Sequence, residues 1–326
     1  MIKSKQEFKN AGVFYQDDTF FSIWFVSEKK MGLYTSNFTK IAEWSVKLNP
    51  NGGLVRTYDN KFIMFDDGIS MFFEDGKLDH TELRFYLKFE NNLKVYIDIH
   101  EEHKLYIENS DQKYWIDFFV GKKIFLEKIL IQEVANKNLM IATSLLDGYE
   151  LWRLDYNKII DAENVYGGAF VNFGNKIYLI LSSSVKRGLF CIDAKTGEVI
   201  DFFPDILSFA INDANNIYAN KFRGIICKIN AITHEIHEWD VHKLITDSGF
   251  YTIGDSHCTV ADGILYFTQN MGAKNAKLGI LDTNSQQLLC KYDFPPECGT
   301  ISSIQVSKER LFVHTQDKTL HIFEKE

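Results

Sequence analysis

Residues 173–203 read FGNKIYLILSSSVKRGLFCIDAKTGEVIDFF, and this stretch decides the fold. It alternates polar turns with apolar runs: a turn, a run, a second turn, a second run, a third turn at residues 194–198 and a final run. Apolar runs of about five to eight residues between turns rich in Gly, Asn and Asp are typical of β-strands joined by hairpins. The stretch therefore predicts three consecutive antiparallel strands.

The same pattern recurs along the chain. The next copy spans residues 215–239, and it places Gly224 and Cys227 each 36 residues after Gly188 and Cys191. Four strands in about 40 residues is the size of one blade of a β-propeller. The sequence therefore predicts an all-β fold, a single β-propeller domain over residues 1–326 with seven to eight four-stranded blades. Eight repeats are counted from the first apolar residue after the polar turn, which falls at Phe20, Phe62, Leu105, Leu139, Ile177, Ile217, Ile264 and Leu311.

The two ends of the chain are predicted to meet in one blade. The last copy, residues 303–323, holds only three strands, and residues 2–8 precede the first complete unit. If residues 2–8 supply the fourth strand, the ring is closed and its exposed strand edges are removed. Residues 122–138 are the best candidate for a helix, but helical periodicity is poor throughout and two strands are expected there.

One turn resembles a known repeat. Residues 192–199, IDAKTGEV, are similar to the D-x-x-T-G-x turn of the PQQ-like (quinoprotein-like) β-propellers, and the repeat length is also that of WD40-like propellers. Weaker echoes occur at residues 229–233 and 281–285. The resemblance implies a propeller fold and little chemistry, because propellers host many activities. Quinone-binding members dock their blades through a tryptophan late in each repeat. Only Trp44 and Trp239 are similarly placed here, so we expect no cofactor.

Composition narrows the setting and the class of partner. The chain has 36 Lys and Arg against 44 Asp and Glu, a formal net charge of −8, which argues against nucleic acid as a partner. Residues 58–111 carry thirteen acids against six bases, a net of −7. The chain shows no signal-peptide core, no apolar run of membrane length, and five scattered cysteines without a CxxC pair. We therefore expect a cytoplasmic monomer with free thiols and no membrane contact.

The loops between the second and third strands of the blades are the first candidates for a binding surface, because loops on a rigid scaffold often carry function. On the predicted strand assignment, one side of this face is acidic and the other is basic. A two-signed face suits protein recognition, and the alternative is ordinary turn residues on a wet surface. The candidates are Asp66, Asp67, Asp111 and Asp147 on the acidic side, and Lys186, Arg187, Arg223 and Lys274 on the basic side.

The longest link between blades, residues 241–256, adds two aromatic candidates. Phe250 and Tyr251 could anchor a partner if they are exposed, or could fold back and cap the blade. Histidines also cluster near this link, at His234, His237 and His242. The first two would face opposite sides of a strand, so their ligand atoms would not converge and no metal site is expected.

No catalytic signature appears: no nucleophile elbow, P-loop, dinucleotide-binding glycine motif or calcium-loop pattern. We therefore predict a protein that is not an enzyme and that binds another protein. The specific hypothesis is a bacterial immunity-type protein that neutralises a toxin, such as a basic toxin domain, by covering it. Two alternatives stay open. One is an enzyme acting on a carbohydrate or another small molecule in the central funnel, because two well-placed carboxylates leave no motif. The other is a scaffold in a larger assembly.

Overall fold

The computed structural model groups the chain into two compact units, and each is described by itself. Unit 1 comprises residues 1–84 and 244–326, and unit 2 comprises residues 85–243. For residues 56–88 and for Arg223 only the backbone is described. The described chain excludes residues 1, 17–19, 46–55, 59–60, 67–68, 75–76, 82–83, 89–92, 98–103, 110–111, 120, 135–136, 254–256, 271–275 and 326.

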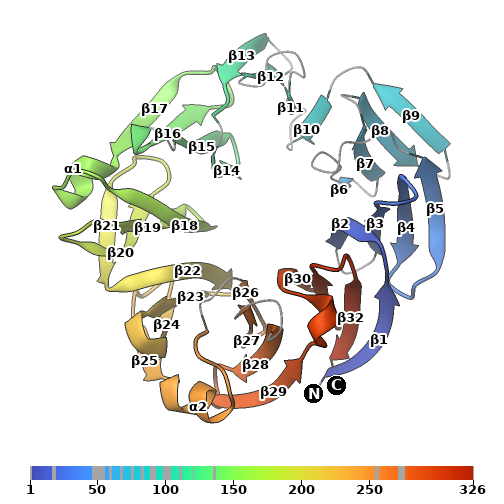
Figure 1. Ribbon diagram of the computed structural model, residues 1–326. Coiled ribbons are helices and arrows are strands. Elements are labelled where there is room, and N and C mark those ends of the chain that lie inside the picture. The colour runs from blue at the N-terminus through green and yellow to red at the C-terminus, as the bar shows by residue number, and fades with distance from the viewer. Residues whose placement is uncertain are drawn as a thin grey trace. The chain divides into compact units, whose positions relative to one another are not determined.

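Unit 1 contains four sheets, each of four strands, within the described residues (Figure 1). In each sheet the strands lie side by side in chain order, and β1 completes the last sheet beside β32. The short 3-10 helix η4 (Pro296–Cys298) lies in the link between the last two sheets. The strands are β2 (Ala11–Gln16), β3 (Phe20–Phe25), β4 (Lys30–Thr35), β5 (Lys40–Ser45), β6 (Arg56–Tyr58), β7 (Lys61–Asp66), β8 (Ile69–Glu74), β9 (Lys77–Thr81), β26 (Cys258–Ala261), β27 (Ile264–Asn270), β28 (Ala276–Asp282), β29 (Gln287–Asp293), β30 (Ile301–Val306), β31 (Arg310–Thr315), β32 (Leu320–Lys325) and β1 (Ile2–Phe8).

Unit 2 contains the other four four-stranded sheets of the described chain. Its strands are β10 (Arg84–Lys88), β11 (Lys94–Ile97), β12 (Lys104–Glu108), β13 (Lys113–Asp117), β14 (Lys123–Leu126), β15 (Ile129–Val134), β16 (Leu139–Ser144), β17 (Glu150–Asp155), β18 (Tyr166–Phe173), β19 (Lys176–Ser182), β20 (Arg187–Asp193), β21 (Val199–Pro204), β22 (Ile206–Asp213), β23 (Asn216–Lys221), β24 (Ile225–Asn230) and β25 (Ile236–Asp240). Three short helical segments lie in its loops or at its boundary: α1 (Tyr156–Ile160), η3 (Phe222–Gly224) and α2 (His242–Asp247). Among the described residues, no helix is long and apolar enough to cross a bilayer.

The core explains why the second strands read as continuous apolar runs. Side chains of a strand point alternately to its two faces. In β19, Ile177, Leu179 and Leu181 pack in a core shared with the sheet β14–β17. Tyr178 and Ile180 pack on the other face, in a core shared with the sheet β22–β25. Because both faces are covered by neighbouring sheets, every position from 177 to 181 is buried.

The predicted pairing of the two chain ends is confirmed. Strand β1 runs antiparallel to β32 from the pair Ile2 and Lys325 to the pair Phe8 and Leu320 (Figure 1). The Phe8 ring reaches the first sheet, with its centroid 5.8 Å from that of Phe21 and 5.3 Å from that of Tyr34. The two strands expected within residues 122–138 are also confirmed, as β14 and β15.

Two of the eight repeats were assigned one strand out of phase. Leu105 and Leu139 lie on the third strands of their sheets, β12 and β16, whereas the second strands are β11 and β15. Strand β11 has only four residues, so its apolar run is too short to stand out from the flanking polar residues. As a result, Asp147 lies between the third and fourth strands of its sheet and does not belong to a second-to-third loop.

The turn that resembles the PQQ-like repeat recurs in three sheets, between the third and fourth strands. The side-chain oxygens of Asp193, Asn230 and Asp282 each accept hydrogen bonds from the backbone N–H groups two and three residues further along. The left-handed position of the turn is held by Gly197, with φ of 75°, in the strongest copy and by His234, with φ of 64°, in a weaker one. The two echoes in the sequence therefore have the same local geometry, an Asx turn.

A docking tryptophan that sequence reasoning missed packs on the strongest of these turns. Trp152 lies on the fourth strand β17 and is buried. Its indole Nε1–H donates to the carbonyl of Ala194 at 3.0 Å. A Cβ added to Gly197 would lie 2.7 Å from the indole, which is closer than carbon atoms approach. Two independent features therefore require glycine at this turn: the left-handed backbone conformation and the indole ring that covers the position.

The cysteines lead to a prediction about reactivity. All five are free, and burial raises the pKa of both Cys227 and Cys258 to about 12. At pH 8 only about one molecule in 10⁴ would carry either thiolate, and the thiolate is the reactive form. We expect both residues to resist alkylation by iodoacetamide in the native protein and to react within minutes in denaturant, measured by peptide mass spectrometry. Rapid native labelling of either thiol would contradict this description of the core.

Candidate functional site

The structure separates the residues that were predicted to form a two-signed face. Lys186 and Arg223 lie in second-to-third connections of neighbouring sheets, as predicted, and Arg187 is the first residue of the third strand β20. Asp147 is exposed but lies at the opposite end of its sheet, between β16 and β17, so its placement on the same face is corrected. Asp66 is the last residue of β7, and its side chain is not described. The remaining candidates, Asp67, Asp111 and Lys274, lie outside the described residues.

Three exposed apolar side chains lie at the same end of these two sheets as the basic candidates. They are Tyr166, Val185 and Phe222, with exposed fractions of 71%, 73% and 61%. Large apolar side chains this exposed are unusual when they gather at one place, and such patches mark interaction sites. We call the set of Tyr166, Val185, Lys186, Arg187, Phe222 and Arg223 the end patch.

Strand register places the end patch at one end of two neighbouring sheets. Tyr166 pairs with Ser182, so it begins β18 at the end where β19 connects to β20. Asp205 lies in the link between the two sheets, from β21 to β22. Its backbone N–H donates to the Arg187 carbonyl at 3.2 Å, which attaches this link to the start of β20. The next residue, Ile206, begins β22 and pairs with Lys221, which directly precedes Phe222. The two connections are thus continuous through the link between the sheets.

Local hydrogen bonds fix the tip of the first connection. The Ser183 hydroxyl accepts from the backbone N–H groups of Val185 and Lys186 at 3.2 and 3.1 Å, and it donates to the Lys186 carbonyl at 3.0 Å. This ST turn leaves the Val185 side chain at the tip, directed away from the sheet. The serines at this position therefore have a structural role.

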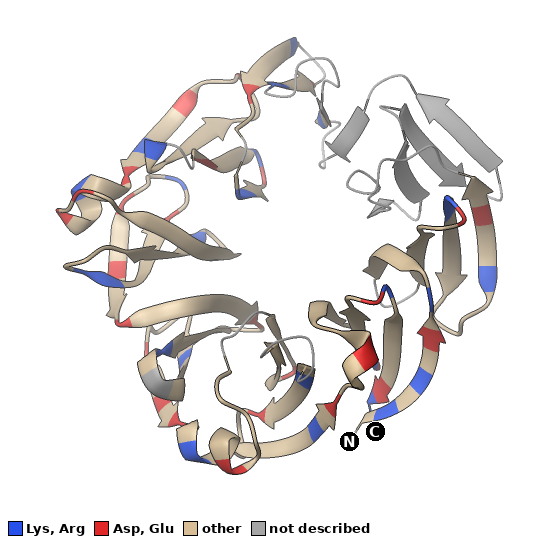
Figure 2. Cartoon of the chain, viewed as in Figure 1, with Lys and Arg blue, Asp and Glu red and all other residues tan. Residues whose placement is uncertain are grey.

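The end patch is positively charged, and one of its cations is engaged by an aromatic ring. The Lys186 ammonium lies 4.4 Å from the centroid of the Phe202 ring, a cation–π distance. Arg187 is exposed. Figure 2 shows that most other charged residues of the described chain lie in loops and on outer strands, with both signs interspersed. Most of the acidic stretch at residues 58–111 lies outside the residues whose side chains the structure describes.

In the described part of the long link, residues 241–253, Phe250 folds back on the following sheet, which is the alternative left open by the sequence. Phe250 is 1% exposed and its ring packs in a tilted arrangement on Phe267, with 4.9 Å between the two centroids, so it is removed from the candidates for partner binding. Tyr251 is 66% exposed and stays a candidate. The first residues of the link form the helix α2.

The predicted histidine cluster does not converge on a point. His234 donates through Nδ1 to Asp201 at 2.7 Å and accepts from the Lys176 ammonium through Nε2 at 2.8 Å. Lysine has no acceptor, so this geometry fixes the neutral tautomer with its proton on Nδ1. His237 is exposed and lies 3.7 Å from Glu235, and His242 begins α2. His234 is thus a structural residue between two sheets.

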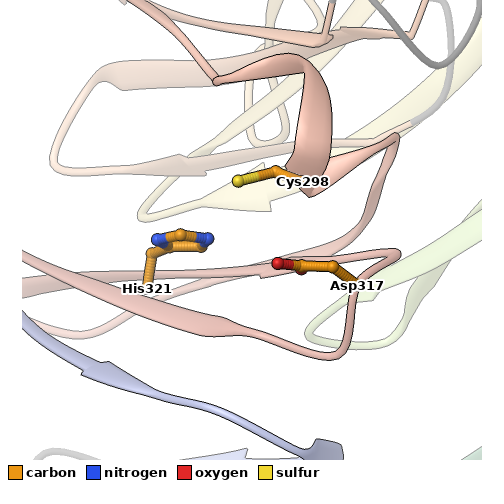
Figure 3. Close-up of side chains that lie close together, drawn as sticks. All are labelled: Cys298, Asp317 and His321. Carbon is orange, nitrogen blue, oxygen red and sulfur yellow. The ribbon is translucent and has the colours of Figure 1, made fainter.

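A different group, which sequence reasoning missed, does converge. Ligand atoms of Cys298, Asp317 and His321 all lie within 4.8 Å of one another, and the three side chains point toward a common space (Figure 3). Cys298 ends η4, Asp317 lies between β31 and β32, and His321 is on β32. Cys298 and His321 are buried and Asp317 is exposed. No linear motif announces these residues, because 19 positions separate the first two.

Hydrogen bonds hold the members of this group in place. Asp317 accepts from the Thr315 hydroxyl at 2.7 Å and from the hydroxyl and backbone N–H of Thr319 at 2.8 and 3.1 Å. These bonds favour the carboxylate and hold its pKa below the usual range, although burial opposes them. His321 Nδ1 lies 3.0 Å from Glu7 Oε1 on β1. Burial raises the pKa of the Cys298 thiol, and the acids around it raise it further.

Comparison with solved structures identifies the architecture. The chain matches BamB from Moraxella catarrhalis over 100% of both chains, with a TM-score of 0.60 and 11% identity. It matches Sqt1 from Saccharomyces cerevisiae over 99% of both chains, with a TM-score of 0.60 and 10% identity. The β-propeller domain of Cps50 (Swd1) from Myceliophteria thermophila matches over 100% of both chains, with a TM-score of 0.54 and 11% identity. The chain therefore has the predicted β-propeller repeat fold, with eight four-stranded sheets among its described residues. No family model and no curated protein matches the sequence.

Proposed function

We propose that this chain is a non-catalytic protein-binding propeller and that the end patch is its docking surface. The observation that carries the proposal is the exposure of Tyr166, Val185 and Phe222 on one continuous end of two sheets. Aromatic side chains and arginine are enriched at the energetic centres of interfaces, and the end patch combines both with an aliphatic tip. Rigid strands hold the connections, so little ordering entropy is lost when a partner binds.

The finer hypothesis is that the partner is a toxin and the chain its immunity protein. The net charge of −8 favours the long-range approach of a protein with positive net charge, an attraction that salt would weaken, and the surface of that protein that contacts the basic end patch would be apolar or acidic. The cytoplasmic location and monomeric state predicted from the sequence agree with this role and stay predictions. The alternatives of a small-molecule enzyme and of a scaffold have no specific observation in their favour.

The docking surface is tested by replacing its apolar side chains. A variant with Tyr166→Ser, Val185→Ser and Phe222→Ser should fold normally and lose its partner by at least about 100-fold in affinity, because each anchor contributes one or more kcal/mol. The measurement is affinity capture from the native host with quantitative mass spectrometry, followed by titration of the captured partner. The matched control is Leu146→Ser, Tyr149→Ser and Ile232→Ser, three exposed apolar residues in third-to-fourth connections.

The control triple should retain the partner, and equal loss in both triples would reject the end patch as the docking surface. The toxin hypothesis is tested separately. Expression of the captured protein alone should arrest growth, and co-expression with this chain should restore it. A harmless partner would reject the immunity role and leave protein binding in place.

A further inference from the structure

The group of Cys298, Asp317 and His321 combines three kinds of ligand from three segments of unit 1. A thiol, a carboxylate and an imidazole lie within 4.8 Å of one another (Figure 3). Cysteine sulfur and histidine nitrogen select zinc-like transition metals, whereas magnesium and calcium prefer oxygen ligands alone. The donor set therefore indicates one class of cation.

Glu7 gives the imidazole the setting of a metal ligand. Metal-bound histidines almost always donate their second ring N–H to a carboxylate or carbonyl, which orients the ring and strengthens the ligand. Here Nδ1 faces Glu7 Oε1 at 3.0 Å, so Nδ1 carries the donated proton. Nε2 consequently presents its lone pair on the opposite side of the ring. This pairing reaches across 314 positions of sequence, from β1 to β32.

We expect no neighbouring group to donate a hydrogen bond to Nε2, so its lone pair can bind a cation. The Thr315 hydroxyl lies 3.1 Å from Nε2, but it has two competing acceptors, Asp317 Oδ1 at 2.7 Å and the Thr319 carbonyl at 3.1 Å, and we expect its single proton to go to the closer, charged carboxylate. In the neutral ring, Nε2 thus faces an oxygen lone pair. His321 is 5% exposed, so water has little access to satisfy the nitrogen. A buried, oriented acceptor beside a thiol and a carboxylate is the arrangement that a metal site needs.

We propose that Cys298 Sγ, Asp317 and His321 Nε2 bind one zinc-class divalent cation, and that Glu7 is the positioning residue for His321. On binding, the Cys298 thiol releases its proton to solvent and the metal–sulfur bond forms. Three protein ligands leave one tetrahedral position for water, on the exposed side next to Asp317.

The site joins the segments that bring the chain ends together. Cys298 belongs to the link between the last two sheets, Asp317 to a loop of the last sheet, and Glu7 to the N-terminal strand. A bound cation would therefore stabilise the pairing of β1 with β32. Because ligands that bind only the folded state raise its stability, the melting temperature should rise with zinc concentration.

Zinc and cobalt binding to the full chain tests the proposal. The metal-free protein is titrated with ZnCl₂ against a chromophoric chelator, and Co²⁺ is added in a separate experiment. We expect one Zn²⁺ per chain, and a thiolate-to-cobalt charge-transfer band in the near ultraviolet. Cys298→Ser and His321→Gln should abolish both signals. Glu7→Gln should keep the band but weaken zinc binding by about 10–100-fold, as outer ligands usually do.

Cys290→Ser is the matched control, because Cys290 is a free cysteine of the preceding strand and is not in the group. This variant should bind zinc and cobalt as the unmodified chain does. Asp317→Asn, at an exposed loop position, keeps the test decisive if a buried variant fails to fold, and it should lose zinc affinity at least about 10-fold. Stoichiometric zinc binding that survives Cys298→Ser, or none at micromolar zinc, would overturn the proposal.

Discussion

Replacing Trp152 with alanine is expected to lower the free energy of unfolding by about 3–5 kcal/mol, as for other buried aromatic residues truncated in cores. The indole packs in a core shared by two sheets and covers Gly197 of the next sheet. Its removal creates a cavity at the junction and leaves the Ala194 carbonyl without its indole donor. The measurement is equilibrium unfolding in urea, followed by tryptophan fluorescence and circular dichroism.

Two variants divide this loss into its parts. Trp152→Phe keeps most of the apolar packing and removes the hydrogen bond to Ala194, so it should cost about 1–2 kcal/mol. Trp115→Ala removes the same kind of side chain from the middle of another fourth strand, β13, where the ring is 48% exposed. It should cost about 1 kcal/mol, mainly from contact with Tyr106. A loss at Trp152 no larger than at Trp115 would show that the ring does not dock the sheets.

Sequence alone predicted the parts of the fold that depend on strand alternation. The run at residues 177–181 predicts a strand because five apolar residues stand between two polar turns. The incomplete last repeat predicts the contribution of residues 2–8 because a sheet without its fourth strand exposes an edge. Both predictions use local patterns and chain counting, and both are confirmed.

The errors arise where local patterns lose phase or where contacts are distant. Strand β11 has four residues, too few to be recognised as the second strand, so the repeat at Leu105 was assigned one strand late. The repeat at Leu139 was also assigned one strand late, which placed Asp147 at the wrong end of its sheet. Phe250 and Tyr251 are adjacent aromatic residues, and composition gives no reason to expect different burial for them. In the structure Phe250 packs against Phe267, whereas Tyr251 is exposed. Sequence cannot distinguish them without the surface on which they fold.

The functional candidates show the same limit. The basic residues of the end patch were found from loop position, but the exposed Tyr166, Val185 and Phe222 were not, because apolar residues in a strand-rich sequence are expected to be buried. Cys298, Asp317 and His321 converge only through the packing of the last two sheets, and Glu7 joins them from the far end of the chain. Such sites carry no spacing signal.

Removing residues 2–8 should destabilise the chain by about 4–6 kcal/mol, the second large effect expected. Phe8 is partly buried and packs on Phe21 and Tyr34, so loss of its ring should cost about 2–3 kcal/mol, and the lost strand hydrogen bonds add to it. The deletion also leaves β32 as an exposed edge, which promotes aggregation. Thermal unfolding and light scattering measure both effects. Lys5→Ala removes only an exposed ion pair with Glu324 and should change stability by less than about 1 kcal/mol.

A synthetic peptide of residues 1–9, added to the truncated chain, distinguishes a missing strand from general damage. If β1 contributes by pairing with β32, the peptide should add to that edge as a fourth strand and raise the melting temperature in a concentration-dependent way. The same peptide with Phe8→Ala should bind more weakly, because the backbone pairing is kept while the aromatic contacts are lost. A truncated chain as stable as the full chain would show that the N-terminal strand does not hold the last sheet together.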